Sequence, residues 1–384
     1  MKMKEEAAGR LREFSDFAGS DKILILERIW EMKKRVSYVC LAGLLACSML
    51  SVTGCGSKEG GKGSLTVFSY GEYMDPDVLD QFTEETGIEI KYEESLTPEE
   101  MYTKYKSGAI KYDLLCSTDY MLQKFIDEGE LQKIDRGAME NSGNIGDKYW
   151  KLAAAFDPEN AYTVPYFWGT LGILYDTTRV SEPVDSWDVL FNGDYAGEVI
   201  MQNSMRDTYM AALKYLGYSL NSNNENEIRE AQELLLKQKP DVQAYLVDEA
   251  RDEVVAGNAV MAIVYSGEAY LGHQYNENLA YVIPKEGSNV WLDAWCVTKH
   301  CEDLDAAQKF LDFLCREDIA KKNFEYIYYS TPNDAVVESL SEEERADEAL
   351  VPAEDATDNC EVSLQLEPES NDLMNELWKE LKAD

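Results

Sequence analysis

The sequence predicts an α/β fold with two lobes, each built on a mostly parallel sheet that is flanked by helices. Strand and helix patterns alternate three times within about 65 residues after Leu65, which is typical of a parallel, doubly wound sheet. About 330 residues follow Cys55, enough for two α/β lobes, since domains usually contain about 100–200 residues. A content of 45% hydrophobic and 11% aromatic residues indicates a globular protein.

The first group of elements covers residues 65–129 and repeats one pattern, a short strand followed by a helix that ends near a glycine. Asp75 followed by Pro76 is a typical helix start, and Thr97 with Glu100 predicts a capping box. The predicted strands are Leu65–Tyr70, Ile88–Tyr92 and Tyr112–Cys116, and the helices after them begin at Asp75, at Thr97, and at Ser117 or Asp119, and end near Gly87, Gly108 and Gly129.

A second group of elements begins at Tyr166, and we find no internal repeat. A further strand is expected after Asp293, and the polar, acidic tail ends in a helix that we expect to pack on a lobe. The other predicted strands are Tyr166–Tyr175, Glu198–Met201 and Ala259–Tyr265, and the predicted helices begin at Ser186–Trp187 or cover Asp207–Leu216, Glu225–Lys237, Leu304–Cys315 and Asn371–Lys382.

Polar and aromatic residues follow two strands of the first group. In parallel sheets, ligands bind beyond the carboxyl ends of the strands. Tyr70–Tyr73 follows the first predicted strand, and Ser117–Tyr120 follows the third. We therefore expect a binding site at this edge of the sheet.

Acidic residues strongly outnumber basic ones. Seven of the 73 acidic and nine of the 36 basic residues precede Cys55, so 66 acidic and 27 basic residues follow it. This charge repels phosphates and attracts cations, which argues against a nucleic-acid partner and favours a cationic ligand. Acidity also serves solubility, so alone it identifies no ligand.

The cysteines and histidines predict neither a metal site nor a disulfide framework. Five cysteines follow Cys55, an odd number without CxxC spacing. His273 and His300 are the two histidines of the chain, so a histidine-rich metal centre is excluded. The counts allow a Ser-His-Asp triad, but no G-x-S-x-G motif occurs, and we interpret both histidines as surface or structural residues.

The segment before Leu65 has the pattern of a bacterial lipoprotein signal. The basic cluster Lys33–Arg35 precedes an uncharged apolar run that ends in Val52–Cys55, where small residues before a cysteine permit lipid transfer and cleavage. The alternative is a transmembrane helix, since the uncharged stretch Val36–Ser57 reaches the length of about 20 residues that a span needs.

We interpret Met32 as the true start of translation, so that residues 1–31 are a mis-assigned upstream extension and residues 32–54 are the signal peptide. Residues 55–64 are then the lipidated Cys55 and a flexible tether without apolar side chains. This interpretation places the rest of the chain outside the cytoplasm, anchored by lipid to the outer face of the cell membrane.

A series of short motifs extends over roughly residues 65–340, each of them weak alone but specific in this order: Phe68–Tyr73, Gln81–Ile88, Tyr112–Leu114, Leu131–Asp135, Val164–Gly169, Trp187–Leu190, Pro284–Gly287 and Ser330–Asn333. With these motifs the chain resembles the periplasmic spermidine/putrescine-binding proteins of polyamine ABC transporters.

The resemblance implies a periplasmic-binding-protein type II fold, in which two lobes joined by crossing strands close on a ligand between them. It implies one lobe from residues 65–165 and 294–333, and a second from residues 166–293 and 334–384. It further implies a monomer without enzymatic activity, cofactor or metal, which delivers spermidine or putrescine to the permease subunits of an ABC importer.

The resemblance also implies the residues of the site. Aromatic residues should line the methylene chain, and carboxylates should hold the ammonium groups. The implied aromatic residues are Tyr70, Tyr73, Tyr265, Trp291 and Tyr329. The implied carboxylates are Glu72, Asp207, Asp293 and Glu268, and Glu268 stands at a position used by the putrescine-preferring branch. Ser117, Asp119 and Ser204 complete the predicted site.

Three positions depart from the family pattern. Ser204 stands where spermidine binders carry an aspartate, Gly71 replaces a usual hydroxyl residue, and Asp119 stands where an aromatic residue is frequent. Asp119 would restore the charge that Ser204 lacks. These departures leave the preferred polyamine open.

The residues support this chemistry independently of the family. A polyamine is an apolar chain that carries cations, so its site must combine aromatic rings with carboxylates. Trp291 and Asp293 are two residues apart on an extended segment and therefore face the same side. Two alternatives stay open: a binding protein for another organic cation or small solute, and an extracellular hydrolase that uses paired carboxylates such as Asp207 and Asp293.

Overall fold

The computed structural model describes residues 63–353 and 355–383. The predicted upstream extension, the signal peptide and the lipidation site Cys55 lie outside the described residues. No helix within the described ranges is both long and apolar enough to cross a membrane.

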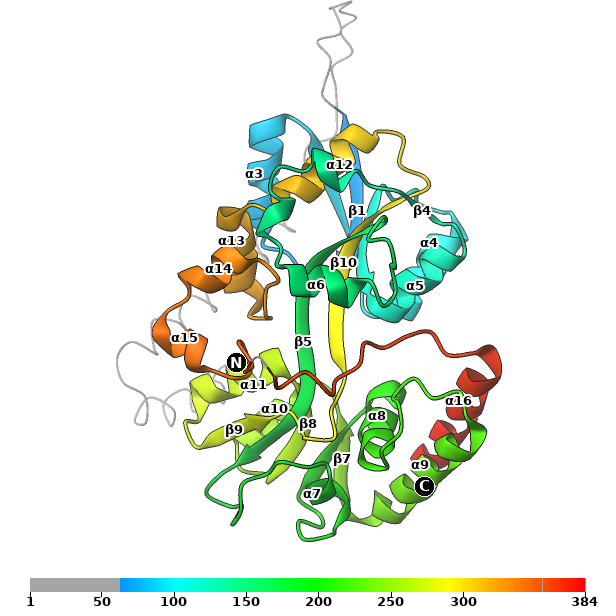
Figure 1. Ribbon diagram of the computed structural model, residues 1–384, viewed down its shortest axis with the longest axis vertical. Helices are drawn as coiled ribbons and strands as arrows, with labels where there is room; N and C mark the ends of the chain where they lie inside the picture. The colour runs from blue at the N-terminus through cyan, green and yellow to red at the C-terminus, as the bar shows by residue number, and fades with distance from the viewer. Residues whose placement is uncertain (1–62, 354, 384) are drawn as a thin grey trace, which may run out of the picture. The chain divides into compact units, whose positions relative to one another are not determined.

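The first lobe is built around three parallel strands, with helices on both faces (Figure 1). Asp75 and Thr97 cap two of these helices through their side chains, as predicted, and Gly87 and Gly108 end them in the left-handed conformation. The strands are β1 (Ser64–Tyr70), β2 (Glu89–Ser95) and β3 (Leu114–Thr118), and the helices after them are α3 (Pro76–Thr86), α4 (Pro98–Ser107) and α5 (Asp119–Asp127).

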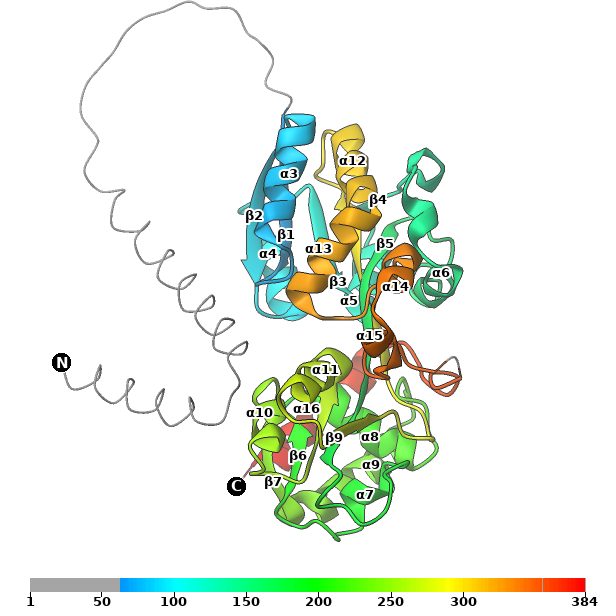
Figure 2. The same ribbon diagram turned by 90° about the vertical axis from the view of Figure 1, so that its left-hand side faces the viewer.

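Two long strands run between the lobes, as Figures 1 and 2 show. They are β5 (Thr163–Asp176) and β10 (Val290–Thr298), which pair antiparallel, and all their residues are buried. Within the first lobe β10 pairs with β3, while the second half of β5 pairs with strands of the second lobe. The continuous sheet order β2-β1-β3-β10-β5-β8-β6-β7 thus joins both lobes.

The second lobe combines parallel and antiparallel strands. Here β6 pairs parallel with β7 and β8, and β5 pairs antiparallel with β8 and β9. Its strands are β6 (Val199–Gln202), β7 (Val242–Leu246), β8 (Met261–Tyr265) and β9 (Leu279–Val282), and its helices are α7 (Asp188–Phe191), α8 (Met205–Tyr215), α9 (Glu225–Gln238), α10 (Glu249–Val255) and α11 (Ser266–Tyr275).

The chain after β10 returns to the first lobe and then crosses to the second (Figure 1). The final helix α16 (Pro368–Lys382) packs on α8 and α9, with Met374 and Leu381 fully buried, as expected for the tail. The remaining elements are β4 (Leu131–Gln132), α6 (Asp147–Ala153), α12 (Leu304–Leu314), α13 (Glu317–Ile327), α14 (Asp334–Ser339), α15 (Glu342–Ala346), and the short 3₁₀ helices Arg136–Ala138, Ser142–Asn144 and Lys239–Asp241.

Several sequence predictions differ from the structure in detail. The third strand begins at Leu114 rather than Tyr112, and β10 begins at Val290, before Asp293. The capping box of α4 is half formed, because Glu100 accepts a hydrogen bond from the backbone N–H of Leu96 instead of that of Thr97. The elements that the sequence did not predict include β7, α10, α11 and α13.

Candidate ligand-binding site

A chain of five aromatic rings connects the two lobes. The Tyr73 ring lies 5.4 Å from that of Tyr70 and 6.2 Å from that of Tyr329, between centroids. The Trp291 ring lies 5.3 Å from Tyr329 and 6.3 Å from Tyr265. All four contacts are edge-to-face, the geometry that aromatic pairs prefer.

These rings come from distant parts of the sequence. Tyr70 ends β1, Tyr265 ends β8, Trp291 lies on the connecting strand β10, and Tyr329 follows α13. Gly267, at the start of α11, permits the approach of Tyr329, since a Cβ atom at this glycine would lie 1.9 Å from the tyrosine Cδ1. The structure therefore brings all five predicted aromatic residues together.

Asp293 lies within this group of rings. It is 7% exposed, lies opposite Thr118 in the pairing of β10 with β3, and its Oδ2 accepts a 2.6 Å hydrogen bond from the Tyr73 hydroxyl. Burial raises the pKa of Asp293 to about 6, although hydrogen bonds from Tyr73 and Thr118 oppose the shift. Near neutral pH Asp293 is therefore a buried carboxylate, mostly ionised, that no lysine, arginine or histidine of the described ranges pairs with.

Asp207 supplies a carboxylate from the second lobe. It lies in the first turn of α8, and its Oδ2 accepts a 2.8 Å hydrogen bond from the Tyr265 hydroxyl. Burial raises the pKa of Asp207 as well. Ser204 is the N-cap of the same helix and accepts a 3.4 Å hydrogen bond from the Asp207 backbone N–H, so it fixes the helix turn that carries the carboxylate.

Asp119 and Ser117 lie at the carboxyl end of β3, where the sequence placed them. Ser117 is fully buried, and its hydroxyl lies 3.3 Å from that of Tyr70. Asp119 is 1% exposed and begins α5; its Oδ1 accepts a 2.7 Å hydrogen bond from the Tyr120 backbone N–H. Burial raises the pKa of Asp119 to about 8, and the nearby charge of Asp293 adds to this.

Two predicted carboxylates differ from these three, because one is exposed and the other, which lies near Tyr329, is paired with an arginine. Glu72 is exposed, in the turn after β1, and has a left-handed backbone with φ 54°. Glu268 accepts a 2.6 Å ion-pair hydrogen bond from Arg251, so a cation of the protein already compensates it. Burial raises the pKa of Glu268 to about 7, and Arg251 opposes the shift.

The sequence reasoning missed Arg206. Its guanidinium donates hydrogen bonds of 3.1 Å to the Leu364 carbonyl and to Asn221 Oδ1, and it lies near enough to Asp119 to lower the pKa of that carboxyl. A positive charge in the first turn of a helix opposes the helix dipole. This unfavourable position in the helix was the feature of the sequence that could have indicated contacts of Arg206 outside its own helix.

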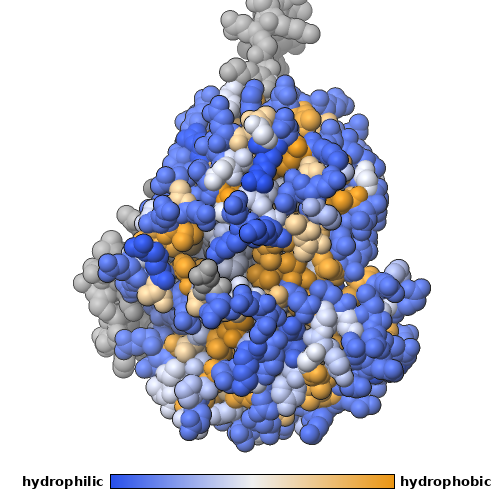
Figure 3. Space-filling view, in the orientation of Figure 1, coloured by the Kyte–Doolittle hydropathy of each residue, from blue (hydrophilic) through white to orange (hydrophobic). Residues whose placement is uncertain are grey.

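The arrangement is suited to hold an elongated apolar molecule that carries positive charges. Aromatic faces accommodate methylene groups and attract ammonium groups, and the buried carboxylates accept their hydrogen bonds. Figure 3 shows apolar side chains gathered at the narrow region between the lobes. Among the described residues no group of three His, Cys, Asp or Glu side chains is arranged to hold a metal ion.

A model of the family described as bacterial extracellular solute-binding protein matches residues 77–353. The chain belongs to this family. The solute-binding protein is also 33% identical over 356 residues to the spermidine/putrescine-binding periplasmic protein of Escherichia coli K12, a match that covers 92% of this chain and 99% of that protein. With the putrescine-binding periplasmic protein SpuD of Pseudomonas aeruginosa it shares 30% identity over 369 residues, covering 92% of this chain and 100% of the relative.

Solved structures confirm the two-lobed binding-protein fold. The spermidine/putrescine ABC transporter substrate-binding protein PotD of Streptococcus pneumoniae matches with a TM-score of 0.76 and 36% identity, over 83% of this solute-binding protein and 98% of that chain. A putative spermidine/putrescine ABC transporter from Listeria monocytogenes matches with a TM-score of 0.75 and 35% identity, over 83% and 98% of the two chains.

Proposed function

We propose that this protein is the solute-binding component of an ABC importer and that it holds a polyamine, spermidine or putrescine, between its lobes. The observation that carries the proposal is the combination of a continuous chain of aromatic rings with a carboxylate from each lobe, the buried Asp293 from β10 and the half-buried Asp207 from α8. The relatives named for binding spermidine or putrescine support the same ligand class.

The expected affinity follows from these contacts. Each ring facing an ammonium group contributes about 0.5–2 kcal/mol when desolvated, and each charge-assisted hydrogen bond contributes about 1.5–3 kcal/mol net. Two carboxylates and two or three rings would reach about −8 kcal/mol after the cost of association, which corresponds to micromolar affinity.

The binding residues have no catalytic role in this proposal. Tyr73 and Tyr265 hold the carboxylates of Asp293 and Asp207, which fixes them as hydrogen-bond acceptors for a cation. A hydrolase would instead need one of the two carboxyls to donate a proton and the other to act as base or nucleophile. The ligand is therefore bound by shape and charge and released unchanged to the permease subunits.

We further propose that Cys55 carries a lipid that anchors the protein, as a monomer, to the outer face of the cell membrane. The small residues before Cys55 and the tether after it support this placement. A tether of this composition behaves as a flexible coil, so the lobes would reach the permease without a rigid connection.

Calorimetric titration of a fragment that begins at Ser57 tests the ligand class. We expect saturable binding of putrescine, spermidine or both, and no heat of binding from neutral sugars. Binding of a different organic cation, with silence toward both polyamines, would retain the site and replace the solute. Binding of a neutral sugar would contradict the role that we assign to the carboxylates.

A further inference from the structure

Among the described residues, Asp119 has a buried oxygen atom without a hydrogen-bond partner, although the nearby Leu292 backbone lowers the pKa of this carboxyl. Its Oδ1 accepts the hydrogen bond from Tyr120, whereas its Oδ2 has no hydrogen-bond partner in the part of the chain that the structure describes. The residue is 1% exposed. A buried polar atom without a partner is unfavourable for folding, and such atoms persist where a ligand or a function requires them.

The charged and titratable groups that face Asp119 come from three elements. Asp293 on β10 raises the pKa of Asp119, and Arg206 on α8 lowers it. The third group is the neighbouring Tyr120 on α5, whose pKa Asp119 raises in turn. The guanidinium of Arg206 donates its hydrogen bonds to the Leu364 carbonyl and to Asn221 Oδ1, and it acts on Asp119 through its charge.

Thr118 lies beside both carboxyl groups. Its hydroxyl lies 3.4 Å from Asp119 Oδ1, and it is near enough to Asp293, which lies opposite Thr118 in the sheet, to lower the pKa of that carboxyl. Both carboxyl groups thus belong to the first lobe and its connecting strand, on either side of one threonine. One cation between them would satisfy the free oxygen of Asp119 and reduce the repulsion from Asp293.

We propose that Asp119 and Asp293 form a two-carboxylate pair that binds one ammonium group of the ligand, and that this pair releases a proton when the ammonium group enters. The inference rests on the proposed function, because it requires a cationic ligand. It adds a specificity-determining residue, Asp119, and a proton linkage to that function.

The proton balance follows from the raised pKa values. With a pKa of about 8, the Asp119 carboxyl holds its proton near pH 7 in the ligand-free protein, while Asp293, with a pKa of about 6, is mostly ionised. The incoming ammonium group stabilises both carboxylates, so the O–H bond of Asp119 breaks and the proton passes to the solvent. No covalent bond forms with the ligand.

The experiment is a calorimetric titration of the full chain in detergent with putrescine and with spermidine at pH 7. Each titration is repeated in two buffers with different enthalpies of ionisation, which gives the number of protons released. We expect a release approaching about one proton per bound ligand. In the Asp119→Asn variant we expect the affinity to fall roughly ten- to a hundredfold and the proton release to disappear.

Asp127→Asn is the matched control. Asp127 is an exposed aspartate at the other end of the same helix, so its variant should keep both the wild-type affinity and the proton release. The melting temperature of ligand-free Asp119→Asn should equal or exceed that of the wild type, since the change removes an unsatisfied carboxyl and an asparagine oxygen can still accept from Tyr120.

Three results would overturn the inference. Wild-type affinity and proton release in Asp119→Asn would show that Asp119 does not hold the ligand, while leaving the proposed function intact. Polyamine binding by the wild type without proton release would refute the linkage whatever the variant does. Failure of the wild-type protein to bind either polyamine would remove the proposed function and the inference together.

Discussion

Trp291 and Asp293 show how two residues determine one side of the site. Because the two residues are two positions apart on β10, their side chains lie on the same face of the strand. The contacts of Trp291 with Tyr329 and of Asp293 with Tyr73 agree with this. Both residues are buried, with 8% and 7% exposure. A ring and a carboxylate can therefore contact one cationic group in an environment that excludes water and strengthens both interactions.

The Asp293→Asn variant tests this arrangement. Loss of the charge removes a charge-assisted hydrogen bond worth about 1.5–3 kcal/mol, so the dissociation constant for putrescine or spermidine should rise roughly ten- to a hundredfold. Isothermal calorimetry measures the change, and Asp305→Asn, at an exposed position in the first turn of α12, serves as the control. An unchanged affinity in Asp293→Asn would refute its role as a ligand contact.

The raised pKa values predict how stability depends on pH. The folded-state pKa of Asp119 is about 8 against an ordinary value of 3.8, so between these values the folded protein holds a proton that the unfolded chain has released. Its contribution to the free energy of unfolding should therefore decrease as the pH rises from about 4 to about 8, and Asp293 should add the same trend up to about 6.

Thermal unfolding of the ligand-free protein across this range provides the measurement. Relative to the wild type, Asp119→Asn should gain stability as the pH rises from 5 to 8, because asparagine does not ionise. A constant difference between the two proteins across this range would show that Asp119 does not titrate as its burial indicates.

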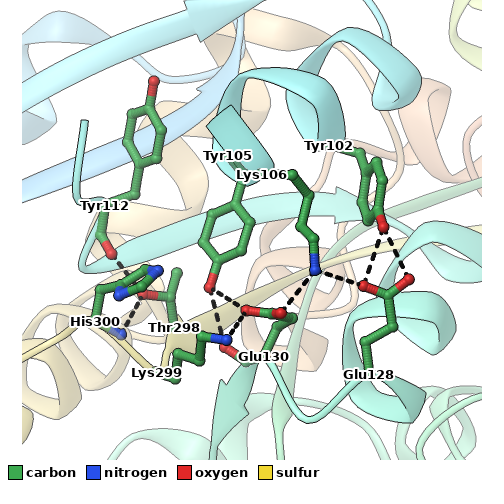
Figure 4. A network of polar contacts seen from close by, with 9 residues as sticks. All are labelled: Tyr102, Tyr105, Lys106, Tyr112, Glu128, Glu130, Thr298, Lys299 and His300. Atoms are coloured by element: carbon green, nitrogen blue, oxygen red, sulfur yellow. Dashed lines mark hydrogen bonds and ion pairs between the residues drawn. The ribbon is translucent and has the colours of Figure 1, made fainter. Parts of the chain in front are cut away.

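At the scale of elements, a polar network joins three parts of the first lobe (Figure 4). Glu130, which is 5% exposed, accepts hydrogen bonds from Lys106 at 2.8 Å and from Tyr105 at 3.1 Å, both on α4, and forms a 2.7 Å ion pair with Lys299 after β10. Burial alone would raise the pKa of Glu130, but the two lysines and the tyrosine outweigh it and lower the pKa to about 2. The network thus fixes α4 to the end of β10.

Replacement of Glu130 by glutamine should lower the free energy of unfolding by about 1–3 kcal/mol, since it removes charged hydrogen bonds from a buried site. In the wild type, the contribution of the Glu130 carboxylate to the free energy of unfolding should be present above pH 4.5 and decline as the pH falls toward 2. Urea unfolding measures the change. Glu128→Gln is the matched control, because Glu128 pairs with the same Lys106 at the surface and should cost about 0–1 kcal/mol. Equal losses of unfolding free energy in both variants would contradict the stronger stabilisation that we assign to the buried Glu130.

At the scale of the whole molecule, two strands and one crossing segment connect the lobes. Besides β5 and β10, the chain before α16 contacts both lobes: the Gln365 backbone N–H donates to Gln123 on α5, and the Leu364 backbone N–H donates to Asn221 after α8. Few connections of this kind permit hinged closure, which a solute-binding protein requires to enclose and release its ligand.

Membrane anchoring belongs to this scale as well. In bacterial cells that process lipoproteins, the Cys55→Ser variant should lose incorporation of labelled fatty acid and should no longer partition into the detergent phase, because the thiol that accepts the lipid is gone. Cys360→Ser, at a half-buried position that is distant in the sequence from the predicted signal, should behave as the wild type. Labelling that persists in Cys55→Ser would refute Cys55 as the lipid attachment site, and detergent-phase partitioning that persists without labelling would favour a membrane-spanning segment.

Local patterns of the sequence determined much of the fold. Strand alternation, the caps at Asp75 and Thr97, and the glycines after α3 and α4 depend on neighbouring residues, so the strands and helices of residues 65–129 were predicted one by one. The elements that the sequence did not predict depend on tertiary contacts. Helix α11 contains two glycines, which have low helix propensity, and one of them is required by the adjacent Tyr329 ring.

The same distinction applies to the site. Residue type and spacing, together with the family resemblance, predicted the rings and the carboxylates of Asp207, Asp293 and Asp119. Only the tertiary structure decided which carboxylates remain available to a ligand, because ion pairs and burial depend on contacts between different elements. Arg251 compensates Glu268, Glu72 lies in solvent, and one oxygen of Asp119 has no hydrogen-bond partner in the described part of the chain.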